Sequence, residues 1–370
     1  MRILLTGGGS GGHVYPLIAV YRKIVQISKY QGIDADCLFM GPDSFSVSVF
    51  RKEKVRSKMV LAGKLRRYFS VLNIMDIFKI PIGFVQVFWQ LFWFMPDAIF
   101  AKGGYGSVLP VFVGWIFRIP IIIHESDAAP GLANRILGRF AKMIIVSFQE
   151  TQQIFPSHKT AFVGNPIREE LFKEIPADAR EILGIKSNRP LILILGGSQG
   201  AEEINDVVLL SLPELMLKYE IIHQCGAGRI EKMKKGDLVQ VRDFESRHLF
   251  HIFETLDEKQ MASAYHLADL IISRAGAGAI FEIAAFGKPS ILIPYSGASD
   301  HQYKNAYAYS EGGAAMVLEN ENVKPHMLVS DINSLVSDPK RMEAMGKAAL
   351  EFAKPDAAEK IANAILALGS

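Results

Sequence analysis

The chain has little cysteine, no long uninterrupted apolar run and no large excess of either charge. Among its 370 residues only Cys37 and Cys225 are cysteines, which excludes a disulfide framework and a cysteine-based metal site and favours a reducing compartment. The first apolar run, residues 2–6, is too short for a secretory signal peptide, which needs about 7–15 apolar residues. Glycine, at 31 residues, is close to average, which excludes a collagen-like or low-complexity chain.

The chain contains enough apolar material for two cores. Apolar residues make up 49% and charged residues 21%, and 370 residues at roughly 150 per domain predict two domains. The net charge of +3 hides an asymmetry, because residues 1–165 carry 19 basic and 9 acidic side chains whereas residues 166–370 carry 22 and 29. We therefore expect the two halves to meet different partners, the basic half an anionic one and neither half a nucleic acid.

Two stretches of the chain begin in the same way. Residues 2–6 and 191–195 are apolar runs, and each is followed by a glycine-rich turn and a helical pattern. Helical stretches also separate further strand-like runs, at 36–40, 98–101, 120–123, 143–147, 220–224, 249–253, 270–273 and 290–294. This alternation predicts an α/β protein with two doubly wound, Rossmann-like domains. We expect domains at 1–164 and 165–345, with the C-terminal helices of 346–370 packing back on the first.

Residues 80–95 form an uncharged aromatic stretch that includes Trp89 and Trp93. This stretch is shorter than the roughly 20 apolar residues of a membrane-spanning helix. Two interpretations stay open: a helix buried against the sheet, or a surface helix that dips into a bilayer. The second is favoured by a neighbouring basic stretch, because cationic and apolar residues side by side suit anionic lipid. The basic residues of that stretch are Arg51, Lys52, Lys54, Arg56, Lys58, Lys64, Arg66 and Arg67.

A glycine-rich loop follows the first predicted strand. Residues 7–13 read Gly-Gly-Gly-Ser-Gly-Gly-His, and a helical pattern follows. Backbone N–H groups of such a loop can approach a phosphate at a helix N-terminus. A P-loop is excluded because no Lys-Ser/Thr follows the last glycine, and Asp43 fits poorly as the acidic residue of a dinucleotide site. His13, at the start of the helix, is either a neutral imidazole that accepts a proton or a packing residue of the loop.

Two more polar segments follow predicted strands in the first half. Residues 103–107 read Gly-Gly-Tyr-Gly-Ser, and residues 124–127 read His-Glu-Ser-Asp. The carboxyl ends of parallel strands meet at one edge of a sheet, so these segments are expected at the same ligand crevice. The first predicts a second phosphate cradle, with ordinary turns as the alternative.

The second half repeats this pattern. Residues 196–200 are a glycine-rich turn, and residues 273–282 place small residues between a strand and a helix, which leaves room for phosphates. Glu282, about one turn into that helix, can accept hydrogen bonds from two sugar hydroxyls. Residues 300–305, which include Gln302, carry amides that can bind a second sugar.

No metal site is predicted. Asp34 and Asp36 form a nominal D-x-D pair, but they precede a strand, whereas ligands gather at the carboxyl ends. We expect a reaction without a metal and with no cofactor beyond its substrates.

Seven motifs in chain order are similar to those of the MurG family of UDP-N-acetylglucosamine transferases. They cover roughly residues 2–318 and read G-G-S-G-G-H-V-Y-P, K-G-G-Y-G-S, H-E-S-D-A-A-P-G-L-A-N-R, G-N-P-I-R, G-G-S-Q-G-A, S-R-A-G-A-G-A-I-F-E-I and D-H-Q-Y-K-N-A. The resemblance implies the two-domain GT-B fold, with the domains facing across a cleft. It implies an inverting transfer of N-acetylglucosamine from UDP-N-acetylglucosamine to the 4-hydroxyl of the muramyl sugar of lipid I, which forms lipid II of peptidoglycan. It further implies a peripheral protein at the cytoplasmic face of the cell membrane.

The resemblance also assigns residues. It implies His13 as the catalytic base, with Glu125 as a rival. The acceptor diphosphate would be bound by Gly103, Gly104, Tyr105, Gly106 and Ser107. The donor would be bound by Ser10, Gly11, Gly12, Asp127, Arg168, Ser198, Leu256, Ala277, Gly278, Ala279, Ile280, Phe281, Glu282 and Gln302. The commoner family pattern at 125–127 is Glu-Gln-Asn, so the carboxylate of Asp127 replaces an amide and its role stays open.

Three other functions compete with the transferase. A UDP-N-acetylglucosamine 2-epimerase shares the architecture but leaves the basic aromatic stretch without a purpose. A nicotinamide oxidoreductase built on residues 7–13 does not explain the glycine turns of the second half. A non-catalytic membrane-surface protein leaves Glu282 and Gln302 without a role.

Overall fold

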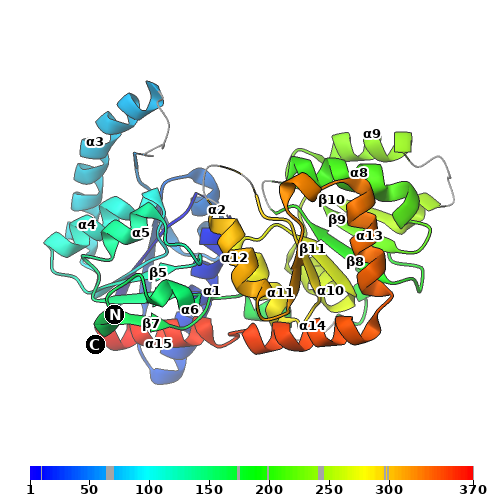
Figure 1. Cartoon of the computed structure of the whole chain (residues 1–370). Helices are drawn as coiled ribbons and strands as arrows, with labels where there is room; N and C mark the ends of the chain where they lie inside the picture. Colours follow the sequence, from blue (N-terminus) through cyan, green and yellow to red (C-terminus); the bar gives the residue numbers. More distant parts are fainter. Residues whose placement is uncertain are drawn as a thin grey trace. The chain divides into compact units, whose positions relative to one another are not determined.

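The computed structural model describes residues 1–9, 11–63, 71–172, 176–197, 200–240, 246–295, 297 and 300–369. Its internal contacts divide the chain into two units. Unit 1 comprises Met1–Arg168 and Lys354–Ser370, and unit 2 comprises Glu169–Ala353. Each unit contains one parallel sheet (Figure 1).

Unit 1 is built on a seven-stranded parallel sheet in the order β3-β2-β1-β4-β5-β6-β7. Its strands are β1 (Arg2–Thr6), β2 (Asp36–Gly41), β3 (Arg56–Met59), β4 (Ala98–Ala101), β5 (Ile121–Glu125), β6 (Met143–Val146) and β7 (Thr160–Phe162). Its helices are α1 (Gly11–Gln31), α2 (Ser44–Lys52), α3 (Val71–Phe94), α4 (Val108–Ile116), α5 (Leu132–Leu137), α6 (Gln149–Gln152) and α15 (Ala357–Gly369), with short 3-10 helices η1 (Tyr105–Ser107) and η2 (Ser157–Lys159).

The strand β1 shows why both faces of this sheet carry helices. Successive side chains of a strand point to opposite faces. Ile3 and Leu5 accordingly join one buried cluster, to which α1 and α15 contribute, whereas Leu4 joins another, to which α3 and α4 contribute. A strand buried on both faces needs apolar residues at every position, which is why residues 2–6 read as a continuous apolar run.

Unit 2 is built on a six-stranded parallel sheet in the order β10-β9-β8-β11-β12-β13. Its strands are β8 (Leu191–Leu195), β9 (Glu220–Gln224), β10 (Phe250–Phe253), β11 (Leu270–Ser273), β12 (Ser290–Leu292) and β13 (Ala315–Val317). Its helices are α7 (Ala179–Leu183), α8 (Glu202–Leu215), α9 (Ile230–Gln240), α10 (Glu258–Leu267), α11 (Ala277–Ala285), α12 (His301–Ser310), α13 (Pro325–Val336) and α14 (Pro339–Phe352), with 3-10 helices η3 (Glu169–Phe172), η4 (Ser246–Leu249) and η5 (Asn320–Asn322).

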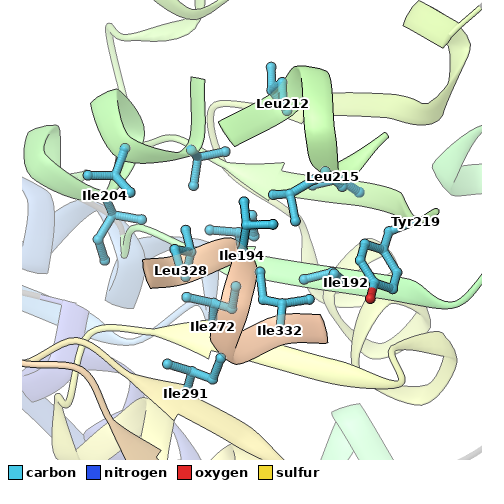
Figure 2. Close-up of a cluster of buried hydrophobic side chains, with 14 of the residues drawn as sticks. Ile192, Ile194, Ile204, Leu212, Leu215, Tyr219, Ile272, Ile291, Leu328 and Ile332 are labelled. Atoms are coloured by element: carbon cyan, nitrogen blue, oxygen red, sulfur yellow. The ribbon is translucent and has the colours of Figure 1, made fainter. Parts of the chain in front are cut away.

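One core cluster of unit 2 includes side chains of its sheet and of the helices α8 and α13. Ile192 and Ile194 of β8 are fully buried against Leu212 of α8 and against Leu328 and Ile332 of α13 (Figure 2). The burial of these aliphatic side chains is the main favourable contribution to folding of the unit, at roughly 1.5–3 kcal/mol for each large side chain.

The predicted α/β class with two doubly wound sheets is confirmed. The division between the units differs slightly from the expected one, because the contacts place it after Arg168 rather than after residue 164. The C-terminal segment also divides: α14 belongs to unit 2, whereas α15 belongs to unit 1 and packs on α1.

The aromatic stretch of residues 80–95 is neither fully buried nor fully exposed. It forms the second part of α3, in which Val87 and Leu91 are buried against the sheet and Trp93 is 78% exposed. The polar residue Gln86 has a structural role, because its amide donates to the Met59 carbonyl (2.8 Å) and accepts from the Leu61 N–H (3.1 Å). No helix within the described residues has both the length and the hydropathy needed to cross a membrane.

Candidate active site

The first glycine loop lies at the carboxyl end of β1 and is held from the side by Asp43. The Asp43 carboxylate accepts from the Gly9 N–H (2.9 Å) and caps α2 by accepting from the Ser46 N–H (2.8 Å). Gly8 has a φ of +134°, and a Cβ there would lie 2.6 Å from the Ser46 hydroxyl. Only glycine fits this position. Ser10, predicted to bind the donor, lies outside the described residues.

His13 is half-buried in the first turn of α1 and faces the glycine loop. Burial lowers the pKa of its imidazole and the nearby Lys102 lowers it further, whereas Asp127 and a hydrogen bond to the Gly8 backbone raise it. The net direction is downward, so the imidazole is neutral near pH 7 and can accept a proton. The sequence predicted this state from the helix dipole, but burial and Lys102 are its main causes.

The second glycine turn, after β4, contacts the first. Gly103 and Gly104 have φ values of +88° and +77°, and a Cβ on Gly104 would lie 3.4 Å from the Gly8 carbonyl and 3.8 Å from the His13 ring. A Cβ on Gly9 would lie 3.3 Å from the Tyr105 ring. The structure thus brings together the two glycine turns that the sequence predicted as a double cradle. Gly11 and Gly12 open α1 beside this place, and Gly106 and Ser107 are buried in η1.

Glu125, the rival base, organises a loop. It ends β5 with 4% of its surface exposed. Its carboxylate accepts from the N–H of Asp127 (3.0 Å), the N–H of Gly131 (2.9 Å) and the amide of Asn134 (2.9 Å). Burial and the charge of Asp127 raise its pKa, and these three donors oppose the rise. Because both carboxylate oxygens already accept hydrogen bonds within the loop, Glu125 is a weaker candidate base than His13.

Sequence reasoning missed Lys102, which is buried at the centre of this edge. Its ammonium lies 2.5 Å from His124 Nδ1, 2.6 Å from the Ser126 hydroxyl and 2.8 Å from the Asn165 side-chain oxygen. The available signal was a lysine placed directly after an apolar strand, at the edge where ligands gather.

Arg168, predicted to bind the donor, is the last residue of the first part of unit 1. It is 7% exposed, and its guanidinium stacks 4.7 Å from the ring centre of Tyr15 on α1. This contact places a fixed positive charge near the start of α1.

In unit 2 the predicted donor residues also follow strands. Gly200, after β8, has a φ of +73°, and a Cβ there would lie 2.5 Å from the Cys225 carbonyl, so this turn requires glycine. Leu256 follows β10 and is buried. Gln302 lies on α12 and accepts from the Tyr295 N–H (2.9 Å). Ser198 lies outside the described residues.

The N-terminus of α11 is the open part of this edge. Gly276 precedes the helix, and a Cβ on either Gly276 or Gly278 would meet no atom within 4 Å. Ile280 and Phe281 point into the core, so the turn can present only its backbone there to a ligand. Glu282 accepts from the Tyr265 hydroxyl (3.0 Å). The first residues of the helix, Ala277 and Ala279, have side chains too small to cover its N–H groups.

Within the parts of the chain that the structure describes, no three His, Cys, Asp or Glu side chains form a cluster that could hold a metal ion. Asp36 of the D-x-D pair instead forms an ion pair with Arg56 at the amino end of β2.

Two doubly wound parallel sheets with glycine turns at their carboxyl ends define a GT-B glycosyltransferase fold. The model of the glycosyltransferase family 28 N-terminal domain matches residues 3–146, and that of the family 28 C-terminal domain matches residues 191–361. The chain therefore belongs to glycosyltransferase family 28.

Curated relatives agree with this assignment. The chain is 37% identical over 346 residues to "UDP-N-acetylglucosamine–N-acetylmuramyl-(pentapeptide) pyrophosphoryl-undecaprenol N-acetylglucosamine transferase 3" of Bacillus thuringiensis (strain Al Hakam), with 90% of this chain and 91% of the relative covered. It is 35% identical over 372 residues to the Treponema denticola transferase of the same name without the numeral, with 95% and 93% covered.

Solved structures share the fold. The crystal structure of Acinetobacter baumannii MurG matches with a TM-score of 0.73 and 24% identity, covering 99% of both chains. A UDP-GlcNAc 2-epimerase from Neisseria meningitidis, bound to UDP-GlcNAc, matches with a TM-score of 0.69 and 14% identity, covering 99% of this chain and 100% of the other. At these identities the likeness extends to the fold alone.

Proposed function

We propose that this protein transfers N-acetylglucosamine from UDP-N-acetylglucosamine to the 4-hydroxyl of the muramyl sugar of lipid I, forming lipid II with inversion at the donor carbon. The observation that carries the proposal is the pair of glycine-turn edges, one in each unit, in a chain 37% identical to a transferase named for this reaction. The fold alone also fits an epimerase, but the identity over 90% of the chain favours the transferase.

Unit 2 holds the donor in this proposal. The open N-terminus of α11 and the glycine turn after β8 direct backbone N–H groups toward the diphosphate, and the helix dipole favours negative charge there. Glu282 binds ribose hydroxyls, and Gln302 binds the transferred sugar. Arg168 supplies a full positive charge as the diphosphate leaves. The residues at 277–279 contribute through their backbone.

Unit 1 holds the acceptor and the base. The turns at 7–9 and 103–106 cradle the acceptor diphosphate, and His13 lies where they meet. His13 takes the proton of the 4-hydroxyl while that oxygen forms a bond to the donor carbon. The bond from this carbon to the phosphate oxygen breaks, and UDP leaves with the electron pair. A single positioned base of this kind typically contributes about 10²–10⁴-fold to the rate.

A membrane surface is the second partner in the proposal. Apolar side chains of α3 and α4 are exposed together, and α3 is linked to the basic strand β3 through Gln86 and through Arg56 over the Phe94 ring. The exposed apolar residues are Ile82, Val85, Trp89, Phe92, Trp93, Phe112, Trp115 and Ile116. This surface suits an anionic bilayer, and it supports a peripheral location at the cytoplasmic face, where the undecaprenyl chain of the acceptor would lie.

One assay tests the transfer directly. The protein is incubated with UDP-N-acetylglucosamine, with and without a lipid I analogue, and UDP release is followed together with the disaccharide product. Release that depends on the acceptor supports the proposal. Acceptor-independent conversion of the donor to its 2-epimer would replace the transferase with the epimerase, and the absence of donor binding would reject both.

The membrane partner is tested with vesicles. A Trp89→Ser, Trp93→Ser double variant should lose at least about tenfold in partitioning to vesicles that contain anionic lipid, because two large apolar side chains no longer enter the interface. Tyr30, an aromatic residue of α1 that is 94% exposed, provides the control as Tyr30→Ser. Equal partitioning of all three proteins, or partitioning that ignores the anionic lipid content, would contradict the membrane surface.

A further inference from the structure

Lys102 occupies the centre of the edge where His13 lies. It directly follows β4, which pairs with β1 on one side and β5 on the other. The backbone N–H of Lys102 donates to the Thr6 carbonyl (2.9 Å), and a Cβ on Gly7 would lie 3.1 Å from the Cβ of Lys102. Only 1% of its surface is exposed. The lysine therefore lies beneath the glycine loop that leads into His13.

The lysine is held by three acceptors from two segments, residues 124–126 and Asn165. His124 Nε2 faces the Gly164 carbonyl (3.0 Å), which can only accept, so this nitrogen carries the ring hydrogen and Nδ1 accepts from the ammonium of Lys102. The other two N–H groups of the ammonium meet Ser126 and Asn165. A protonated lysine has three donors, and three acceptors surround this one.

Four charged or titratable groups lie at this edge together with His13. Lys102 comes from the end of β4, and His124, Glu125 and Asp127 come from the end of β5. The carboxylates of Glu125 and Asp127 favour the charged form of Lys102, although burial lowers its pKa to about 7. The pKa of His124 is held well below its usual value by burial and by Lys102, so this ring stays neutral.

We propose that Lys102 is a positioning residue that carries the positive charge of this cluster, so that His13 enters the reaction unprotonated, and that Asp127 acts on His13 with the opposite sign. This inference rests on the proposed role of His13 as the base. It gives a role to Asp127, which the sequence left open: the carboxylate favours the charged lysine and limits how far the basicity of His13 falls.

The two charges predict opposite shifts for His13. Loss of the positive charge of Lys102 removes a cause that lowers the pKa of His13, so this pKa rises in Lys102→Met. Loss of the negative charge of Asp127 removes a cause that raises it, so the pKa falls in Asp127→Asn. Each shift should be at least about half a unit, since a neighbouring charge commonly shifts a pKa by one unit or more.

The pKa is measured by NMR titration of histidine-labelled full-length protein, with the His13 signal assigned by its loss in His13→Gln. Lys142→Met is the matched control, because Lys142 is exposed and precedes β6 at the amino edge of the same sheet. The acid limb of the pH profile of kcat/KM is measured for the same proteins with the lipid I analogue. We expect the acid limb to move to higher pH in Lys102→Met and to lower pH in Asp127→Asn. In Lys142→Met it should not move.

The outcomes separate the two proposals. If the pKa of His13 stays constant in the folded variants, the inference about Lys102 and Asp127 is overturned, whatever the activity. If this pKa moves as expected while the acid limb does not, the charges act on His13 as proposed but His13 is not the base. If Lys102→Met fails to fold, Asp127→Asn is the deciding variant. Asp127 is only half-buried, and its carboxylate raises the pKa of His13, so the pKa of His13 should fall in this variant.

Discussion

At the scale of single residues, His13 and Glu125 differ in whether they can give or take a proton. His13 is half-buried next to two glycine turns, and its pKa is lowered. Glu125 is almost fully buried, and both its oxygens accept hydrogen bonds from its own loop. We therefore expect that mutation of His13 changes turnover alone, whereas mutation of Glu125 also changes stability.

For His13→Ala we expect turnover to fall at least about tenfold, with the KM for UDP-N-acetylglucosamine nearly unchanged, because the variant loses the base but keeps the donor site of unit 2. The measurement is steady-state kinetics with the lipid I analogue. A variant that turns over at the wild-type rate would remove His13 from the mechanism.

For Glu125→Gln we expect a loss of stability as well as of activity. The amide that replaces one carboxylate oxygen cannot accept from the Asp127, Gly131 or Asn134 donors, so at least one buried donor loses its partner, at a cost of about 1–3 kcal/mol. Thermal unfolding checks this, with His13→Ala as the comparison. Unchanged stability together with abolished turnover would instead favour Glu125 as the base.

At the scale of elements, the strands that sequence reasoning missed share one property. β3 and β7 are the two edges of the first sheet, and β13 is an edge of the second. An edge strand pairs on one side only and is less covered; the residues of β3, Arg-Ser-Lys-Met, are mostly exposed. Cationic side chains on an edge also discourage pairing with another chain. Hydropathy therefore predicted the nine inner strands and the edge strand β10, but not these three edge strands.

The site shows a similar limit. The glycine turns and His13 could be predicted, because a required backbone conformation or a helix start leaves a mark in the local sequence. The role of Lys102 could not, because a lysine is most often a surface residue and only the packing of β1, β4 and β5 around it makes it a buried cation. The same holds for Glu125, whose partners lie up to nine residues further along the chain.

A buried histidine of strand β9 is expected to make the stability of unit 2 sensitive to acid. Burial lowers the pKa of its His223 to about 3, and the ring stays neutral as its Nε2 meets Asn205 (2.9 Å). In the unfolded chain a histidine takes up a proton below about pH 6.5, so the folded state loses stability as the pH falls from there toward 3. At pH 5 this amounts to about 2 kcal/mol relative to neutral pH.

Hydrogen exchange of the β9 amides at pH 5 and 7, corrected for intrinsic rates, measures this effect. In His223→Gln the difference in unfolding free energy between the two pH values should shrink by about 2 kcal/mol. The control is His326→Gln, which replaces an exposed histidine of α13 in the same unit and should keep the wild-type difference. An equal difference in both variants would contradict the neutral, buried state of His223.

At the scale of the whole molecule, the chain leaves unit 1 at Arg168 and returns to it at Lys354. Unit 1 is completed by α15, whose Ile361 and Ile365 are fully buried in the cluster that contains Ile3 and Leu5 of β1. The edge that carries the glycine loop thus belongs to a unit whose core includes a helix from the far end of the chain. The sequence predicts that the C-terminal helices pack back on the first domain; the structure shows this for α15, whereas α14 belongs to unit 2.

This connection predicts a change that is confined to one unit. Ile365→Ala should lower the unfolding free energy of unit 1 by about 2–5 kcal/mol, because it opens a cavity where α15 packs on α1 and β4. Unit 2 has its own core and should be unaffected. Hydrogen exchange of the β1 and β8 amides separates the two effects. Ile154→Ala, the same substitution at a site in unit 1 that is 51% exposed, should stay within about 0.5 kcal/mol of wild type. Equal loss of protection in β1 and β8 would show that the units unfold together.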